Sequence, residues 1–350
     1  MRRWWVPLWP RLLFLLLFVL LFFTPTLPFG SPKGSVSDWV ASYYYVDYSV
    51  GFVRRGLVGT LTPGFLDVKT FAFYSTLLAS LGVALLFTFM TEDRRLWLFF
   101  LLSPATALHL GFDAGRYDHF NLLLLATSLF LIRRSRLLWV IPLLSALGIL
   151  VHEGYVLYAL PVILSALYRR HRGYTLLTAL LTALTVGAVV LFGRLDPSHV
   201  GRFVSRGATP DAVEVLSLGL WDTVGNNLRY VLTEILRRPW DFIVPILLLG
   251  CHFYLYARNL LRGGYPPDVV LAPVPGFLLF LFGYDYPRWA SILIVVLFLH
   301  TAYLNPRLNP SPRERRLALC LMATTLLGPL GAGHYAFPIA EALLRGTPPY

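Results

Sequence analysis

Carboxylates and arginines lie close together in the segment that follows the first apolar run. Asp38 and Asp47 precede Arg54 and Arg55, and the two arginines stand between glycines in the stretch DYSVGFVRRGLVG. A carboxylate can accept a proton from a hydroxyl group, and paired guanidinium groups match phosphate oxygens. Glycines let the backbone bend and approach a ligand closely. The segment could therefore remove a proton beside a phosphate leaving group, or its charges could pair with one another and anchor the loop.

A second cluster, GFDAGRYDHFN, holds Asp113, Arg116, Asp118 and His119 in a short stretch. These residue types could combine metal ligands with a general base. Asp118 is also a good N-cap for a helix that begins near residue 119. Chemistry and helix capping both account for this cluster.

A third cluster is the dipeptide His152-Glu153, which lies between two apolar runs and precedes Gly154. It is not the HExxH zinc motif, because position 156 is Val. Adjacent residues on a helix do not face each other, so a shared ligand role requires the helix to break near Gly154. The alternative is a buried polar contact between His152 and Glu153.

A fourth cluster, GYDYPRWAS, carries Asp285, Arg288 and Trp289 at the start of an apolar run. Arg288 could face an anionic group while Trp289 anchors the segment at the membrane interface. A local pair between Asp285 and Arg288 is the simpler alternative.

The composition indicates an all-α, polytopic membrane protein. Of the 350 residues, 57% are hydrophobic and only 14% are charged, whereas ordinary soluble chains carry about 25% charged residues. This composition excludes intrinsic disorder, a collagen-like chain and a disulfide scaffold. Residues 1–350 are expected to form a single integral membrane domain with about eleven transmembrane helices, each near 20 residues where it crosses fully. The expected spans are 11–29, 70–90, 95–111, 119–132, 137–151, 155–168, 174–193, 241–257, 268–283, 289–304 and 317–338; several are short and could tilt, re-enter or merge.

The distribution of arginine predicts the orientation. The first span follows Met1-Arg2-Arg3 and is interpreted as an uncleaved signal anchor. With the N-terminus in the cytoplasm, alternate short loops place more than half of the 30 basic residues on the cytoplasmic side. This asymmetry accounts for the net charge of +12, so no nucleic-acid partner is expected. All four clusters then lie on the outer face, in the first outer loop (30–69) and in later loops.

The segment 194–240 is the longest stretch between spans, and its second half predicts an amphipathic helix. Leu220, Val224, Leu228, Val231 and Ile235 recur at helical spacing. Such a helix could lie on the outer surface of the bilayer or pack against the protein body.

Taken together, the motifs DYSVGFVRRGLVG, GRYDHFN, HEGY and GYDYPRW, on many apolar helices, resemble the GT-C superfamily of integral-membrane glycosyltransferases and the related bacterial polysaccharide polymerases. The resemblance implies inverting transfer of a sugar or glycan from a polyprenyl-(di)phosphate donor to a glycan or lipid acceptor. The reaction would take place on the extracytoplasmic face of a bacterial inner membrane, during synthesis of cell-envelope glycans. Besides donor and acceptor, membrane lipids are the expected partners.

The resemblance also suggests roles for the clustered residues. Asp47 would be the catalytic base, with Asp38 as second choice, and Arg54, Arg55 and Arg288 would contact the donor phosphate. The region that binds the acceptor or a metal would comprise Asp113, Arg116, Asp118, His119, His152, Glu153 and Asp285. A divalent cation such as Mg²⁺ or Mn²⁺ is possible, but no DxD motif marks its ligands.

Two other functions fit parts of the pattern. A flippase or other transporter of lipid-linked glycans would use polar groups near the middle of the membrane, often on repeated halves with broken helices. A non-catalytic component of an envelope-assembly complex would predict that single Asp or Arg substitutions leave the phenotype unchanged.

Overall fold

The computed structural model describes residues 8–29, 31, 34, 36–62, 64, 67–283, 285–306, 308–331, 336–338 and 340–341. The described residues form helices and connecting loops without a β-strand, and one isolated bridge joins Ser49 and Gly51. The prediction of an all-α fold is confirmed. The Met1-Arg2-Arg3 start, parts of the 30–69 loop and the end of the expected last span lie outside the described residues.

Among the described residues, five helical segments are long and apolar enough to cross a membrane, which indicates a membrane protein. The first comprises α1 (Leu8–Phe23) and the start of the 3₁₀ helix η1 (Thr24–Phe29). The others are α4 (Val68–Met90), α11 (Arg172–Phe192), α15 (Pro239–Arg262) and α18 (Tyr286–Leu304).

The other expected spans fall on shorter helices, so the count of eleven is not confirmed. In the stretch 95–111, two helices are separated around Ser103-Pro104, and in 155–168 a break precedes Pro161. Proline lacks an amide hydrogen and disfavours helical backbone before it, so apolar composition alone does not make one continuous span. The shorter helices are α5 (Arg94–Leu101), α6 (Ala107–Phe112), α7 (Asp118–Arg134), α8 (Val140–Val151), α9 (Tyr155–Tyr158), α10 (Leu160–Tyr168), α16 (Pro267–Val270), η6 (Val274–Leu278), α17 (Leu279–Phe282), α19 (Pro312–Ala323) and η7 (Thr324–Leu327).

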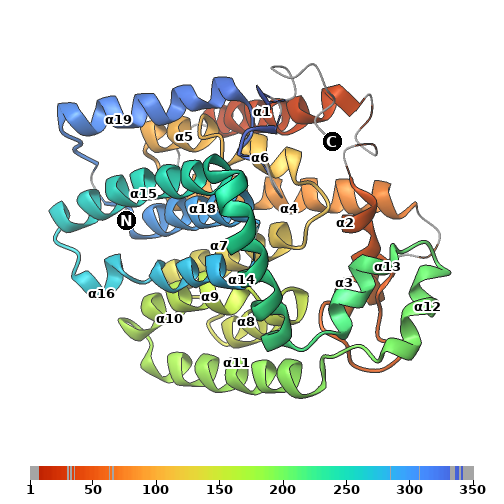
Figure 1. Ribbon diagram of the computed structural model, residues 1–350. Helices are drawn as coiled ribbons and strands as arrows, with labels where there is room; N and C mark the ends of the chain where they lie inside the picture. Colours follow the sequence, from red (N-terminus) through yellow and green to blue (C-terminus); the bar gives the residue numbers. More distant parts are fainter. Residues whose placement is uncertain are drawn as a thin grey trace.

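Helix α18 forms the centre of the bundle. Every residue of α18 except its last, Leu304, is buried, and α15, α7 and α4 pack against it. A helix that is apolar on all sides is typical of a protein core or a membrane span, and α18 lies in the core. By contrast, α11 lies at the periphery (Figure 1), and its side chains Leu176, Leu184 and Leu191 are exposed. An exposed leucine surface of this kind suits contact with lipid.

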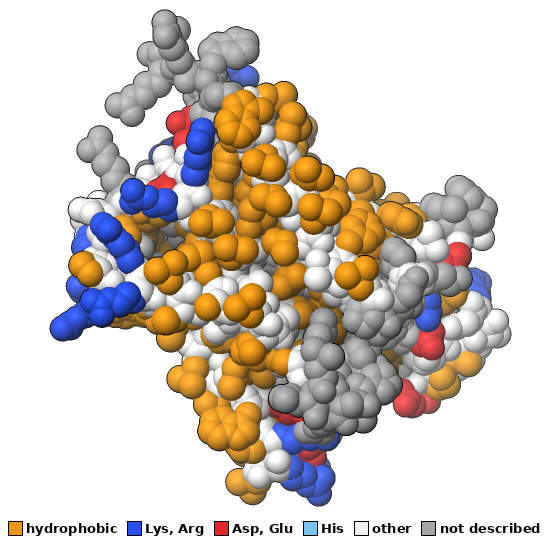
Figure 2. Space-filling model, turned by 90° about the horizontal axis from the view of Figure 1, so that it is seen from above, with side chains coloured by type: hydrophobic (Ala, Val, Ile, Leu, Met, Phe, Trp, Pro, Cys, Tyr) orange, Lys and Arg blue, Asp and Glu red, His pale blue; other side chains and the backbone are white. Residues whose placement is uncertain are grey.

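The long helices run in broadly the same direction, and a loop-rich end carries α2 (Asp38–Ser42), α3 (Gly56–Leu61), α12 (Val200–Val204) and α13 (Pro210–Glu214) (Figure 1). Figure 2 shows a broad hydrophobic face between Lys and Arg side chains at the opposite end and mixed acidic and basic side chains at the loop-rich end. An apolar band between two charged ends is the surface expected of a protein that spans a bilayer.

Helix α14 (Leu220–Arg237) crosses the direction of α11 and α15 (Figure 1). Val231 is buried against Phe242 and Tyr286, whereas Leu228, Leu232 and Leu236 are exposed at intervals of one helical turn. The helix therefore packs on the protein body through one apolar face and leaves a second apolar stripe uncovered.

Candidate active site

Arg288 connects three carboxylates that come from two separate parts of the chain. Its Nε lies 2.9 Å from Oδ2 of Asp118 and 3.7 Å from Oδ2 of Asp113, and its Nη1 lies 3.4 Å from Oδ2 of Asp285. Arg288 is only 6% exposed, and a buried charge requires such partners. Asp118 also accepts a hydrogen bond of 3.4 Å from the hydroxyl group of Tyr158.

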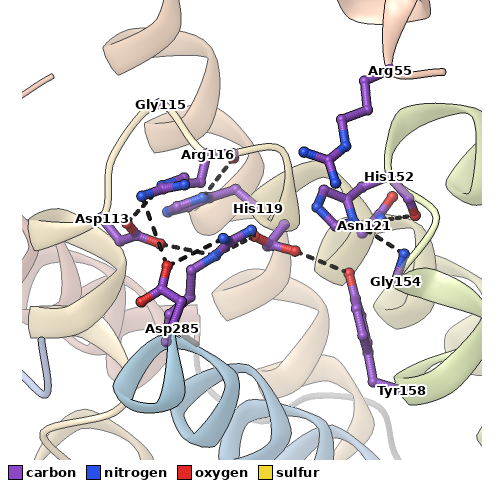
Figure 3. Close-up of polar contacts among 12 residues, drawn as sticks. Arg55, Asp113, Gly115, Arg116, His119, Asn121, His152, Gly154, Tyr158 and Asp285 are labelled. Carbon is purple, nitrogen blue, oxygen red and sulfur yellow. Dashed lines mark hydrogen bonds and ion pairs between the residues drawn. The ribbon is translucent and has the colours of Figure 1, made fainter. Parts of the chain in front are cut away.

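Arg116 extends this network from the turn between α6 and α7. Its Nε lies 3.2 Å from Oδ1 of Asp113, and its Nη2 lies 3.8 Å from Oδ2 of Asp285 (Figure 3). The turn depends on Gly115, whose φ of +94° suits glycine and whose Cβ substituent would lie 2.9 Å from Cγ1 of Val40. The loop sequence thus holds Asp113 and Arg116 on one side of the same network.

A second arginine–carboxylate pair joins the first loop to the His152-Glu153 dipeptide. Arg55 donates from Nε to Oε2 of Glu153 at 3.0 Å, and its Nη2 also binds Oε1. The Arg55 guanidinium lies over the ring of Tyr43, 5.4 Å from its centre. Burial opposes ionisation of Glu153, but the adjacent Arg55 charge outweighs it and holds the pKa of Glu153 well below its ordinary value.

Arg54 points to different partners from its neighbour. Its Nη2 donates to the backbone oxygens of Val215 and Leu218 at 2.5 and 3.2 Å, and the residue is buried. These bonds fix the first loop against the 3₁₀ helix η5 (Val215–Ser217).

His152 lies at the interruption between α8 and α9, so the helix does break beside Gly154. Nδ1 of His152 accepts a hydrogen bond of 3.0 Å from the backbone N–H of Gly154 (Figure 3). Burial, together with the nearby Arg55 charge, lowers the pKa of His152 to about 4. At neutral pH the ring is therefore uncharged, and its proton resides on Nε2, which can donate a hydrogen bond.

These groups surround a polar cavity of about 480 Å³. Arg55, Arg116, Arg288, Asp285 and His152 contribute its charged and polar wall. Aromatic side chains and polar groups of α14 also line the cavity: Trp39, Tyr43, Tyr117 and Trp289, and Thr223, Asn226 and Asn227. The cavity can therefore hold an anion beside a polyhydroxylated group.

The two carboxylates chosen as base from the sequence lie elsewhere. Asp38 is exposed and pairs with Lys69 at 2.8 Å. Asp47 pairs with Arg206 at 2.7 Å and accepts hydrogen bonds from Ser49. Burial raises the pKa of Asp47, but the bonds from Ser49 and the Arg206 charge lower it more. Neither carboxylate lines the polar cavity.

His119 also serves the local structure. Its two ring nitrogens lie 2.9 Å from the backbone oxygens of Arg116 and Leu110, and the side chain is buried. It thereby connects the end of α6 to the start of α7.

The sequence interpretation did not single out the face of α14 that lines the cavity. Thr223, Asn226 and Asn227 stand at intervals of three and four residues, which places them on one helical face. The apolar spacing of α14 predicts an amphipathic helix, but it does not indicate that the polar face of the helix lines a cavity. Tyr158 was missed because a tyrosine in an apolar run carries no separate signal.

The described residues contain no group of three His, Cys, Asp or Glu side chains that could hold a metal ion. The carboxylates of the network face guanidinium groups instead. In comparisons with known proteins, no family model matches the chain, and neither a curated protein nor a solved structure matches it significantly.

Proposed function

We propose that this protein transfers a sugar or glycan from a polyprenyl-(di)phosphate donor to a glycan or lipid acceptor. The observation that carries the proposal is the convergence of Arg55, Arg116 and Arg288 with aromatic side chains around one cavity. The reaction takes place at the outer face of a bacterial inner membrane and contributes to cell-envelope glycans.

The arginines are suited to stabilise the departing phosphate. Arg116 and Arg288 are held by Asp113, Asp118 and Asp285, and Arg55 is held by Glu153. Positioned donors stabilise developing charge without reorganisation during the reaction. No step of the proposal passes through Mg²⁺ or Mn²⁺.

The aromatic wall is suited to the sugar. Trp39 offers a flat apolar surface on which a sugar ring can stack, while Asn226 and Asn227 offer amide groups for its hydroxyls. The rings of Tyr43 and Trp289 carry the guanidinium groups of Arg55 and Arg288. His152 adds a neutral donor at Nε2.

The chemical step joins an acceptor oxygen to the anomeric carbon while the bond from that carbon to the phosphate oxygen breaks. The electron pair of the broken bond leaves with the phosphate, which Arg55 and Arg288 stabilise. The acceptor's hydroxyl proton passes to a carboxylate. Asp285 is the carboxylate that lines the cavity, so we assign it this role in place of Asp47 or Asp38.

The test uses protein purified into nanodiscs with a panel of polyprenyl-linked sugars and candidate acceptors. Wild type should form product, whereas Arg55→Gln and Asp285→Asn should each lose at least 100-fold in rate. Asp211→Asn is the matched control, because Asp211 is an exposed carboxylate on α13. Movement of the lipid across the bilayer without sugar transfer would instead establish a flippase, and unchanged envelope synthesis in cells carrying either variant would indicate a non-catalytic role.

A further inference from the structure

A second cavity of about 290 Å³ adjoins the polar cavity. The two cavities share Arg55, His152, Trp289, Val215 and Thr223 in their walls. Away from this shared wall the second cavity is lined mainly by aliphatic side chains. It is therefore a mainly apolar compartment, and its charged lining residues are Arg54, Arg55 and Glu153.

The aliphatic wall comes from several helices, of which α11 lies at the periphery of the bundle. Val186, Val189 and Val190 belong to α11, Ile149 to α8 and Val224 to α14. Val190 is 52% exposed, and its neighbour Leu191 is 73% exposed on the same apolar helix. The cavity thus reaches the surface that α11 presents to lipid.

We infer that this cavity binds the hydrocarbon chain of the donor, which reaches it from the bilayer between α11 and α14. The inference rests on the proposed function, since it places the lipid part of the same substrate. An amphiphile with one chain and an anionic head matches the two compartments: apolar burial drives the chain into the aliphatic cavity, and the head lies at Arg55.

Arg55 is the group that determines where the phosphate of the amphiphile binds relative to the two cavities. It lines both cavities, and its bonds to Glu153 and the Tyr43 ring fix its position at their junction. Arg288, in contrast, lines only the polar cavity. A phosphate ester bound at Arg55 would direct its chain into the aliphatic cavity and its sugar toward Asp285 and Arg288.

The size of the cavity limits what it holds. Its volume of about 290 Å³ lies just below the range for small-molecule sites, about 300 to 1,000 Å³. It therefore takes the chain segment next to the phosphate, while the rest of a long chain stays in the bilayer. Soluble short-chain phosphates should accordingly suffice to detect it.

The experiment compares binding of geranyl phosphate and methyl phosphate to the full-length protein in detergent. Wild type should bind geranyl phosphate at least 10-fold more tightly than methyl phosphate. Val186→Trp, which fills the cavity, should abolish this gain, and Val190→Trp at the exposed opening should reduce it if Val186→Trp does not fold. Leu184→Trp is the matched control, because Leu184 lies on α11, is 63% exposed and does not line the cavity.

An equal gain in Val186→Trp, Val190→Trp and Leu184→Trp would overturn the assignment. So would binding of phosphatidic acid that displaces geranyl phosphate and is blocked by Val186→Trp, since the occupant would then be a phospholipid. Arg55→Gln should weaken both phosphates by the same factor. A chain-dependent gain without sugar transfer to any acceptor would leave this site in place and refute the proposed function alone.

Discussion

Arg288 and Asp118 are 170 positions apart in the sequence, yet Nε of Arg288 lies 2.9 Å from Oδ2 of Asp118, with both side chains buried. The pair joins the first turn of α18 to the first turn of α7. Asp113 and Asp285 also face Arg288. Its guanidinium group therefore lies among three carboxylates. The start of the most buried helix is therefore fixed by electrostatics as well as by packing.

Removal of this charge should destabilise the protein. Arg288→Met leaves Asp118 buried without its guanidinium partner and with a hydrogen bond of 3.4 Å from Tyr158, and breaking a buried pair costs about 3 to 5 kcal/mol. The midpoint of thermal unfolding in detergent should fall sharply. Arg288→Lys keeps the charge and should recover part of the loss; an unchanged midpoint in Arg288→Met would show that the network adds no stability.

His152 predicts a dependence of stability on pH. The pKa of His152 is about 4 in the folded protein, against an ordinary value of 6.5. Between pH 4 and 6.5 the imidazole is therefore protonated in the unfolded chain and unprotonated in the folded protein. Stability should fall as pH decreases from 6.5 to 4, with a limiting slope of about 1.4 kcal/mol per pH unit from this group.

The comparison that isolates this effect is His152→Asn, whose side-chain oxygen can still accept the hydrogen bond from Gly154. The difference in unfolding midpoint between wild type and His152→Asn should change across this interval and stay constant above pH 7. A difference that is the same at every pH would contradict the assigned protonation state.

Glu153 should make stability depend on pH in a lower pH range than His152 does. Because Arg55 holds the pKa of Glu153 well below 4.5, its contribution is complete above pH 4.5 and is lost as pH falls below that value. Wild type should lose more stability than Glu153→Gln when the pH is lowered from 5 to 3, as measured by thermal unfolding. Parallel losses would mean that the pair with Arg55 does not persist in solution.

Gly115 should not tolerate a side chain. Its φ of +94° strains any L-residue, and an added Cβ would lie 2.9 Å from Val40, so Gly115→Ala should lower stability by at least about 1 kcal/mol. Gly201→Ala is the matched control, since a Cβ there meets nothing within 4 Å and alanine favours the helix. Comparable unfolding midpoints for the two variants would contradict the described turn.

Helix α14 should influence substrate affinity without affecting stability. Asn226 is exposed and lines the polar cavity, so Asn226→Ala removes a hydrogen-bonding group worth about 0.5 to 1.5 kcal/mol. In the transfer assay, kcat/KM should fall roughly 3- to 10-fold at an unchanged unfolding midpoint. Arg229→Gln, on the same helix but outside the cavity wall, should behave as wild type.

The sequence predicted the helical class and identified the segments that build the network, but not their partners. Charged residues that are close together in the sequence, as in GRYDHFN, can be recognised from the sequence alone. The pair Arg55–Glu153 forms because the start of α3 meets the break between α8 and α9, and the pair Arg288–Asp118 forms because the starts of α18 and α7 meet. The choice of Asp47 as base relied on its nearness to Arg54-Arg55 in sequence, whereas Arg206 reaches it from the 194–240 segment.

The number of membrane-spanning helices is likewise not determined by local sequence. Apolar composition predicts that a segment is buried in lipid or protein, and it does not distinguish these environments. Leu160–Tyr168 is as apolar as a span but too short to cross alone after the break before Pro161.

The position of α18 has a consequence for how the protein is made. A nascent chain emerges from its N-terminus, so Asp113, Asp118 and Glu153 are synthesised long before Arg288. During that interval the acidic cluster has Arg116 and Arg55 as partners but not its central cation, and the middle of the bundle has not been filled. Folding is therefore completed late, when α18 inserts, pairs Arg288 with the acidic groups and fills the core. Chains that stop before residue 288 should be recognised as incomplete by membrane quality control.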